Sequence, residues 1–168
     1  MKLSEIQQKF IASWGGLASQ WGVNKTLAQI HGLFLVIDEP ICMEEIMETL
    51  QVSRGNVNLN VRTLINWGMI YKQPVLGERK EFYVGEKDMW LIFKRLLRIR
   101  KEKELDPMLR LVKEIKREAK EKAEETPQKF AERIETIEKF ATQADAMLEI
   151  FLTMNEKRFF KSSLKSGL

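Results

Sequence analysis

Apolar residues three and four positions apart recur through most of this chain, and that spacing constrains its fold more than any other feature. Residues on one face of an α-helix share this period, so each such stretch predicts an amphipathic helix. Only 4 prolines and 9 glycines interrupt the 168 residues, of which 44% are hydrophobic and 31% are charged. The sequence therefore predicts a mainly helical protein with enough apolar material for a core.

Capping and stop signals divide the first half of the chain into four helices. Asn24 and Ser53 are placed to cap the helices that follow them. A residue before proline is disfavoured in a helix, so one helix ends before Pro40, and Gly68 lies where a left-handed residue ends another. The helices are expected over residues 3–22, 25–36, 44–50 and 54–67.

Short β-rich runs follow the fourth predicted helix. Residues 69–75 and 79–84 flank the turn Leu76-Gly77-Glu78, which predicts a β-hairpin. Ile41 and Cys42 are expected to form a very short additional strand. The expected fold class is therefore mainly α with a small β-hairpin.

The second half of the chain predicts long helices. One helix starts at Lys87, and two later starts combine a capping residue with a proline, at Asp106-Pro107 and Thr126-Pro127. The first of these two helices carries a narrow apolar stripe: Met108, Leu111, Val112, Ile115, Ala119 and Ala123. The last helix alternates spacings of 4 and 3, as coiled coils do, at Phe130, Ile134, Ile137, Ala141, Ala144, Leu148 and Phe151.

These stripes predict a helical dimerisation region. The partner of the last helix can be residues 108–123 of the same chain, a second chain, or both. The expected organisation is an amino-terminal domain over residues 1–86, the dimerisation region over 87–160 and a frayed tail over 161–168. The longest apolar run, Gly32 to Ile37, is too short to span a bilayer, and the amino terminus lacks the apolar core of a signal peptide. A cytoplasmic protein without membrane contact is expected.

Charge is unevenly spread along the chain. Residues 1–50 carry 3 basic and 6 acidic side chains (−3), residues 51–104 carry 12 and 6 (+6), and residues 105–168 carry 13 and 12 (+1). The basic middle segment contains the fourth predicted helix and the hairpin. Such a segment suits a polyanion such as nucleic acid.

The fourth predicted helix has an unusual polar face. Val57, Val61, Leu64 and Ile65 mark its inward side. The opposite side carries Gly55, Leu59, Arg62 and Asn66, flanked by Asn56, Asn58 and Thr63. No acidic residue occurs between Ser53 and Gln73, although a merely solvated helix would mix in glutamate. Asparagine and arginine can bond adenine and guanine edges, and a leucine can contact a thymine methyl group.

The order of helices, tight turn, capped helix and basic hairpin predicts a winged helix-turn-helix. Arg62 and Asn58 are expected to read bases, and Lys72, Arg79 and Lys80 to bind phosphates, although Glu78 and Glu81 dilute the charge of the hairpin. The expected DNA contacts are Ser53, Arg54, Gly55, Asn56, Asn58, Leu59, Arg62, Thr63, Lys72, Arg79 and Lys80.

Three stretches of the sequence resemble one known family. The runs WGVNKTLAQIHGLFLVIDEPICMEEI, SRGNVNLNVRTLINWGMI and GERKEFYV occur in order, and the similarity continues through Trp90 to Lys103–Pro107. Over roughly residues 5–110 the chain thus resembles the GbsR-type branch of the MarR-like transcriptional regulators. It departs from them at Gln51, where such turns usually have glycine, and beyond residue 125. The resemblance implies a homodimeric DNA-binding regulator, often a repressor, with some members answering to choline-like solutes.

An effector site is a further expectation. Trp14, Trp21, Phe34, Trp90 and Phe93 lie in the amino-terminal helices and in the helix after the hairpin. If these rings lined a cavity at that junction, they would hold a quaternary ammonium ion by cation–π attraction. The alternative is that they form plain core.

The remaining candidate residues do not indicate an enzymatic function. His31, with apolar neighbours, is expected in the core or an interface, and Cys42 as a buried packing residue. The acidic pairs Asp38-Glu39 and Glu44-Glu45 are interpreted as solvated loops. No nucleophile–base pair, glycine-rich phosphate loop or metal-ligand set is evident, so no catalytic, metal or cofactor site is expected. The leading hypothesis is a sequence-specific DNA-binding regulator acting as a dimeric repressor, with its recognition helix in the major groove; the alternative is a winged-helix protein–protein interaction module.

Overall fold

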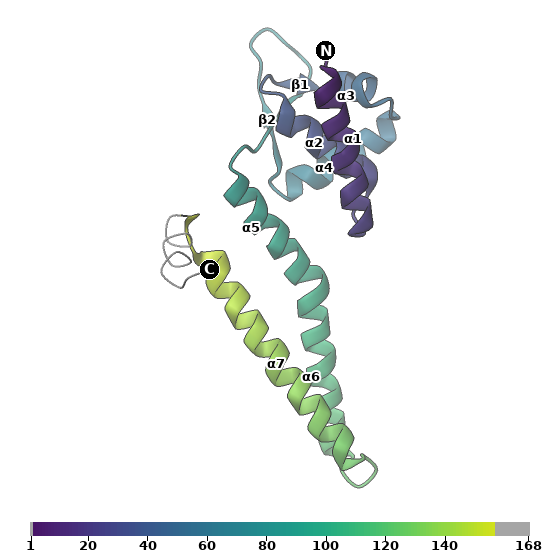
Figure 1. Cartoon of the computed structure of the whole chain (residues 1–168), viewed down its shortest axis with the longest axis vertical. Helices are drawn as coiled ribbons and strands as arrows, with labels where there is room; N and C mark the ends of the chain where they lie inside the picture. The colour runs from purple at the N-terminus through teal and green to yellow at the C-terminus, as the bar shows by residue number, and fades with distance from the viewer. Residues whose placement is uncertain (1, 157–168) are drawn as a thin grey trace. The chain divides into compact units, whose positions relative to one another are not determined.

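The computed structural model describes residues 2–156, and the predicted tail over 161–168 lies outside them. Contacts within the chain divide it after Ile92 into two compact units. The first unit contains four helices and a small sheet, and the second consists of helices (Figure 1). Within the described residues, none of the helices combines the length and apolar character that crossing a membrane requires.

The helices of the first unit begin at well-defined caps. They are α1 (Glu5–Gln20), α2 (Lys25–Val36), α3 (Met43–Leu50) and α4 (Arg54–Asn66). Ser4 and Gln7 form a capping box at α1, and Asn24 caps α2 by accepting a hydrogen bond of 3.0 Å from the backbone N–H of Leu27. Ser53 occupies the cap position of α4 as predicted, but its side chain makes no capping hydrogen bond.

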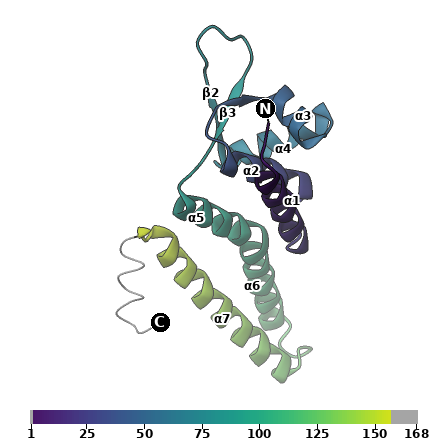
Figure 2. The same ribbon diagram turned by 45° about the horizontal axis from the view of Figure 1, so that its top comes forward.

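The sheet has three antiparallel strands. β1 (Ile41–Cys42), β2 (Ile70–Gln73) and β3 (Phe82–Gly85) lie in the order β1-β3-β2, so β3 is central. Gly68 has a φ of 70° and ends α4 immediately before β2, as expected. The prediction of strands over 69–75 and 79–84 was wrong in length, because the chain leaves the sheet between Gln73 and Phe82 and forms a long loop over 74–81 (Figure 2).

The core of the first unit lies where α2, α3 and α4 meet the sheet. Its fully buried side chains include Ile30, Leu33, Phe34, Ile46, Leu64 and Ile70. Gly85 is needed here, because a Cβ atom at that position would lie 2.8 Å from the backbone oxygen of Phe34. The sheet can therefore approach α2 closely, which fixes β2, β3 and the loop between them relative to the helices.

A helical path runs from α5 (Met89–Arg100), whose first turn belongs to the first unit, through the π-helical turn η1 (Lys101–Leu105) to α6 (Asp106–Glu121) in the second unit. α6 begins at Asp106 with Pro107 in its first turn, as predicted, but Asp106 does not cap it, because its backbone is helical and its N–H donates to the oxygen of Lys101. A proline lacks an N–H and its ring collides with the preceding turn. The wider η1 turn accommodates Pro107, so the helix continues.

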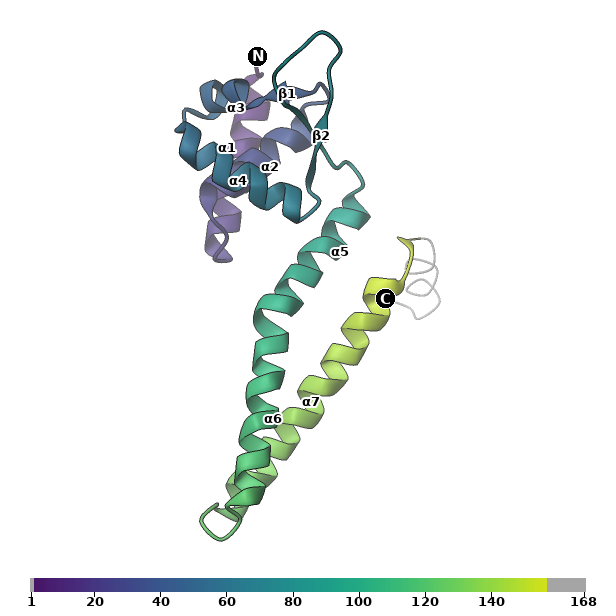
Figure 3. The ribbon, with the colours of Figure 1, turned by 180° about the vertical axis from the view of Figure 1, so that it is seen from behind.

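α7 (Gln128–Thr153) runs back antiparallel to α6 and lies beside it (Figures 1 and 3). The last helix was expected to be capped by Thr126 and to begin at Pro127, and this assignment of the cap was wrong. The Thr126 hydroxyl donates back to the oxygen of Lys122 at 2.9 Å, and Pro127 itself occupies the cap position. The two helices thus form a hairpin closed by a short turn.

Candidate nucleic-acid interface

The two faces of α4 differ as the periodicity predicted. Val57, Val61 and Leu64 are buried, whereas Leu59 is 68% exposed. The exposed side also carries Gly55, Arg62 and Asn66. No acidic side chain belongs to this helix, so the surface that it presents is neutral to basic.

A tight turn joins α3 to α4. Gln51 adopts a left-handed conformation with φ of 53°, which glycine would adopt without steric cost. Its side-chain amide donates to the backbone oxygen of Glu48 at 2.6 Å, and the N–H of Val52 donates to Met47 at 3.3 Å. These bonds satisfy carbonyl groups at the end of α3 and set the direction in which α4 leaves the turn.

Two asparagines of α4 have structural roles. Asn60, which the sequence analysis did not single out, is buried, and its amide donates to the Asn56 side-chain oxygen at 2.6 Å. The Asn56 amide donates in turn to the Thr26 hydroxyl of α2 at 3.4 Å. Asn56, predicted to contact DNA, therefore ties α4 to α2, while Asn58 is half-buried beside the exposed face. The i,i+4 spacing of Asn56 and Asn60 is the sequence feature from which the bond between them could have been predicted.

Other predicted contacts on α4 also have partners within the chain. The Thr63 hydroxyl donates to the backbone oxygen of Leu59 at 3.0 Å, one turn earlier in the helix. Arg54 forms an ion pair with Glu44 at 3.7 Å, and both side chains are exposed. Such an exposed pair contributes little to stability, so a phosphate can replace its carboxylate.

The loop over 74–81, hereafter the wing, extends from β2 and β3 (Figure 2). Gly77 at its turn has φ of 85°, and Arg79 and Lys80 are exposed. Lys72 lies on β2, at the base of the wing, and its ammonium is paired with the carboxylate of Glu81. The pKa of Glu81 is lowered mainly by that bond from Lys72, with smaller effects from Tyr83 and Arg62.

The predicted aromatic residues have different environments. Phe34 is buried in the core, Trp21 is exposed at the end of α1, and Trp90 is half-buried. Trp14 stacks on Phe10 with ring centroids 5.6 Å apart. Within the second unit, Phe93 makes an edge contact with Phe151 at 5.9 Å. The structure thus does not bring Trp21 and Phe34 together.

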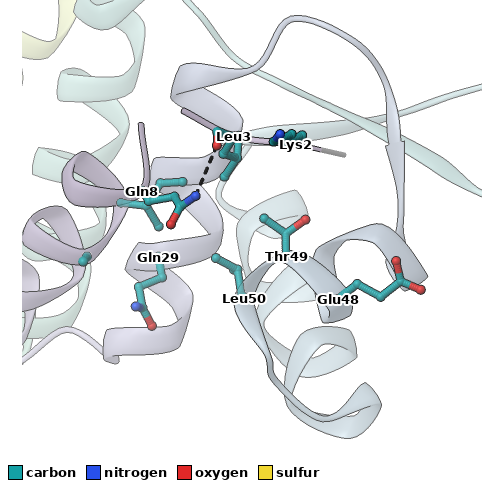
Figure 4. Close-up of a pocket in the computed structure, with 9 residues that line it drawn as sticks. Lys2, Leu3, Gln8, Gln29, Glu48, Thr49 and Leu50 are labelled. Carbon is teal, nitrogen blue, oxygen red and sulfur yellow. Dashed lines mark hydrogen bonds between the residues drawn. The ribbon is translucent and has the colours of Figure 1, made fainter. Parts of the chain in front are cut away.

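A cavity of about 440 Å³ lies elsewhere in the first unit, between α1, α2 and α3 (Figure 4). Its polar lining includes Gln8, Gln29 and Thr49, and the Gln8 amide donates to the backbone oxygen of Leu3 at 3.1 Å. None of the five predicted rings lines it. No sequence motif pointed to this cavity, because its residues come from three helices and from the segment before α1.

His31 and Cys42 are both buried. Burial lowers the pKa of His31 to about 4, and its ring centroid lies 6.1 Å from that of Trp14. Burial also raises the pKa of the Cys42 thiol, which disfavours the reactive thiolate. Both side chains therefore belong to the core of the first unit.

Comparisons with known proteins agree with this architecture. No family model matches the chain. Over 76 residues it is 29% identical to the HTH-type transcriptional regulator MmpR5 of Mycobacterium tuberculosis, an alignment that covers 45% of this chain and 46% of that protein. The chain thus spans about half the length of this curated relative.

A solved structure, described as the crystal structure of a transcriptional regulator, matches 93% of this chain and 99% of its own with a TM-score of 0.67 at 18% identity. That likeness, together with helices α1 to α4, the three-stranded antiparallel sheet and the loop between β2 and β3, confirms the predicted fold class. The chain has a mainly helical fold of the winged-helix type.

Proposed function

We propose that this chain is a sequence-specific double-stranded DNA-binding transcriptional regulator whose helix α4 enters the major groove. The observation that carries the proposal is the exposed, acid-free face of α4, together with the exposed Arg79 and Lys80 of the wing. The similarity to the regulator MmpR5 supports the same function. Major-groove width admits one α-helix, and a helix-turn-helix presents its second helix in this way.

Within this proposal Arg62 and Asn58 read base edges. Arg62 is exposed on the outer face of α4 and can pair bidentately with guanine. Leu59, also exposed, offers an apolar contact to a thymine methyl group. Arg79 and Lys80 on the wing bind phosphates, and Arg54 and Lys72 do so after exchanging their carboxylate partners.

The proposal includes a homodimer formed through the helical hairpin. On α7, Ile134, Ala141 and Leu152 are buried, whereas Phe140 and Met147 are 73% and 71% exposed. On α6, Leu109 and Val112 are buried, whereas Met108 and Leu111 are exposed. The hairpin therefore covers one apolar face of each helix and leaves a second one open.

Helical geometry supports a common side for these open faces. In each helix the exposed apolar residues lie to one side of the buried face. At about 100° per residue, the rotation about the helix axis from the buried face to these residues has the same direction in α6 and in α7. Because α6 and α7 are antiparallel, equal displacements bring them to the same side of the hairpin. Ion pairs between the two helices join Lys116 of α6 to Glu135 of α7 at 3.5 Å and to Glu138 of α7 at 2.5 Å. An amphipathic hairpin of this kind is half of a four-helix bundle, which a second copy completes.

Repression, membership of the GbsR-type branch and response to a choline-like solute are the finer parts of the proposal, and they rest on the sequence resemblance. A ligand regulates DNA binding only if it binds one conformation better than another. Tryptophan fluorescence and thermal melting with millimolar choline and betaine test the effector. A shift in melting temperature together with release of DNA supports it, whereas no change in either discards it.

Selection of bound sequences from random duplexes, followed by a salt titration of the best one, tests the function. Arg62→Ala should cost about 1–3 kcal/mol and relax the preference at one position. Lys80→Ala should weaken all sequences alike and reduce the salt slope by about one. Arg110→Ala, an exposed change on α6, is the control and should alter neither. Absence of salt-dependent affinity for any duplex would instead favour a protein–protein interaction module.

A further inference from the structure

One asparagine of α4 is buried, although the same helix also carries asparagines nearer its exposed side. Asn60 is 4% exposed, whereas Asn56, one turn earlier in the helix, is half-buried. A buried amide is costly unless it is hydrogen-bonded, so its partners are expected to be well defined. The contacts of Asn60 therefore constrain the side chain of Asn56.

Hydrogen-bond chemistry determines the orientation of both amides. The Nδ2 atom of Asn60 lies 2.8 Å from the backbone oxygen of Asn56 and 2.6 Å from its side-chain oxygen, Oδ1. A backbone oxygen only accepts hydrogen bonds, so the group of Asn60 beside it must be the NH2 group. That NH2 group requires an acceptor in the Asn56 side chain as well, and this acceptor is Oδ1. The side-chain oxygen of Asn56 is thus held by a buried donor.

The nitrogen of the Asn56 amide remains available to other partners. It donates to the Thr26 hydroxyl of α2 at 3.4 Å, which is long for a hydrogen bond. Its second N–H has no acceptor among residues 2–156. Asn56 lies in the first turn of α4, and residues near the start of a recognition helix contact base edges. This side chain therefore offers DNA a donor, while its oxygen is turned toward the buried Asn60.

Bases differ in what they offer such a donor. In the major groove guanine presents two acceptors, N7 and O6, and thymine presents O4, whereas adenine presents a donor beside its acceptor. An asparagine whose amide is free to turn prefers adenine, because its oxygen and its nitrogen bond both groups. We propose that Asn60 is a specificity-determining residue, which holds Asn56 as a donor and so directs it to guanine or thymine in place of adenine. The inference rests on the proposed function, and Asn60 acts as a positioning residue that does not itself contact DNA.

The test compares the four bases at the position that Asn56 contacts. Selection of bound sequences by the wild type and by Asn56→Ala identifies this position as the one whose preference the alanine variant loses. The wild type should favour guanine or thymine there. Asn60→Leu keeps the approximate size of the side chain but releases the Asn56 oxygen, so affinity for adenine at this position should rise about tenfold relative to guanine.

Gln29→Leu is the matched control, because it replaces a half-buried amide of α2 with the same apolar side chain. It should leave the base preference unchanged. Asn60→Ala releases the same Asn56 oxygen and should shift the same position, so the result does not depend on how leucine packs. Urea denaturation verifies that each variant is folded.

A double-mutant cycle separates this role from a general effect on the fold. In an Asn56→Ala background, Asn60→Leu should no longer change the base preference, because the amide that it releases is gone. The inference would be overturned if the wild type selected adenine at this position, if Asn56→Ala altered no base preference, or if Asn60→Leu weakened all duplexes alike. Failure of the wild-type chain to bind any duplex would instead refute the proposed function, so the two failures can be told apart.

Discussion

At the scale of single residues, the turn between α3 and α4 depends on one unfavourable conformation. Gln51 is the only residue other than glycine with a positive φ among residues 2–156. A left-handed conformation costs a residue with a Cβ atom roughly 1–2 kcal/mol. The Gln51 side-chain bond to Glu48 is exposed and offsets only part of this cost.

Gln51→Gly should therefore raise the free energy of unfolding by up to about 1 kcal/mol. Gly68→Ala, at a position with φ of 70°, is the opposite change and should lower it by about 1 kcal/mol. Urea denaturation of the three proteins gives the comparison. A destabilised Gln51→Gly variant would mean that the lost side-chain bond outweighs the backbone strain.

His31 predicts how stability depends on pH. It is 6% exposed, and in the part of the chain that the structure describes its Nε2 atom has no hydrogen-bond partner. Burial lowers its pKa to about 4, so between that value and its ordinary value of 6.5 the unfolded chain binds a proton that the folded chain does not. Stability should thus fall as the pH falls through this window.

Between pH 7 and pH 5.5 the loss from His31 should be about 1 kcal/mol. Denaturation of the wild type and of His31→Leu at both pH values measures it. The leucine variant should lose that much less stability, because its side chain cannot be protonated. Equal losses in the two proteins would show that His31 is not the titrating group.

At the scale of elements, the sequence predicted what depends on local signals. Asn24 caps α2, Gly68 ends α4, and the exposed side of α4 carries the predicted residues, because capping, left-handed glycines and helical period act within a few positions. The continuation of the helix through Pro107 was missed, since η1 accommodates a proline that normally starts or ends a helix.

The contacts of the candidate interface were less predictable, because they join residues from different elements. The pairing of Lys72 with Glu81 depends on the register of β2 and β3, and the bond from Asn56 to Thr26 depends on how α4 packs on α2. Periodicity identifies which face of a helix is exposed. It does not identify which exposed charges find partners across a sheet.

The end of α2 gives a prediction at this scale. The Lys87 ammonium donates to the backbone oxygen of Phe34 at 2.9 Å, contacts that of Ile37, and pairs with Asp38 at 3.1 Å. A cation at a helix carboxy terminus satisfies carbonyl groups that have no partner within the helix. This single side chain thus joins the segment just before α5 to the end of α2.

Lys87→Met should keep the apolar stem of the side chain but leave these carbonyl groups without the ammonium. The free energy of unfolding should therefore fall by about 1–2 kcal/mol. Lys80→Met, which changes an exposed lysine on the wing, is the stability control and should have little effect. Thermal unfolding followed by circular dichroism provides the measurement. Equal stability of the two variants would contradict a capping role.

The second unit shows how the hairpin is held together along its charged side. Lys101, whose side chain is 13% exposed, lies in η1 and contacts Asp106 at 2.7 Å and Asp145 at 2.9 Å. Donation from its ammonium to the carboxylates of Asp106 and Asp145 raises the pKa of this lysine. Because removing the lysine leaves two half-buried carboxylates without their cation, Lys101→Met should destabilise the hairpin. Lys139→Met, an exposed change on α7, should be nearly neutral in the same urea denaturation assay.

At the scale of the whole molecule, the opposite side of that hairpin determines the assembly that we propose. Phe140 and Met147 are exposed on α7, and burying two such side chains contributes about 1.5–3 kcal/mol each. An open face of this kind is unfavourable in water, and a symmetric partner would bury it from both copies at once. A dimer would also present two α4 helices to a near-palindromic site, with half-sites about 34–36 Å apart.

Phe140→Glu should therefore convert a dimer into a monomer, because each copy would place a charge in the apolar centre of the bundle. Thr142→Glu adds the same charge on the exposed, polar side of the same helix and should leave the dimer intact. Light scattering at micromolar concentration measures the mass of the wild type and both variants. A monomeric wild type would refute the dimer, and a dimeric Phe140→Glu would mean that copies associate through another surface. Loss of affinity for a palindromic duplex in Phe140→Glu, with affinity for a half-site retained, would link the assembly directly to DNA recognition, since two linked contacts bind more tightly than either contact alone.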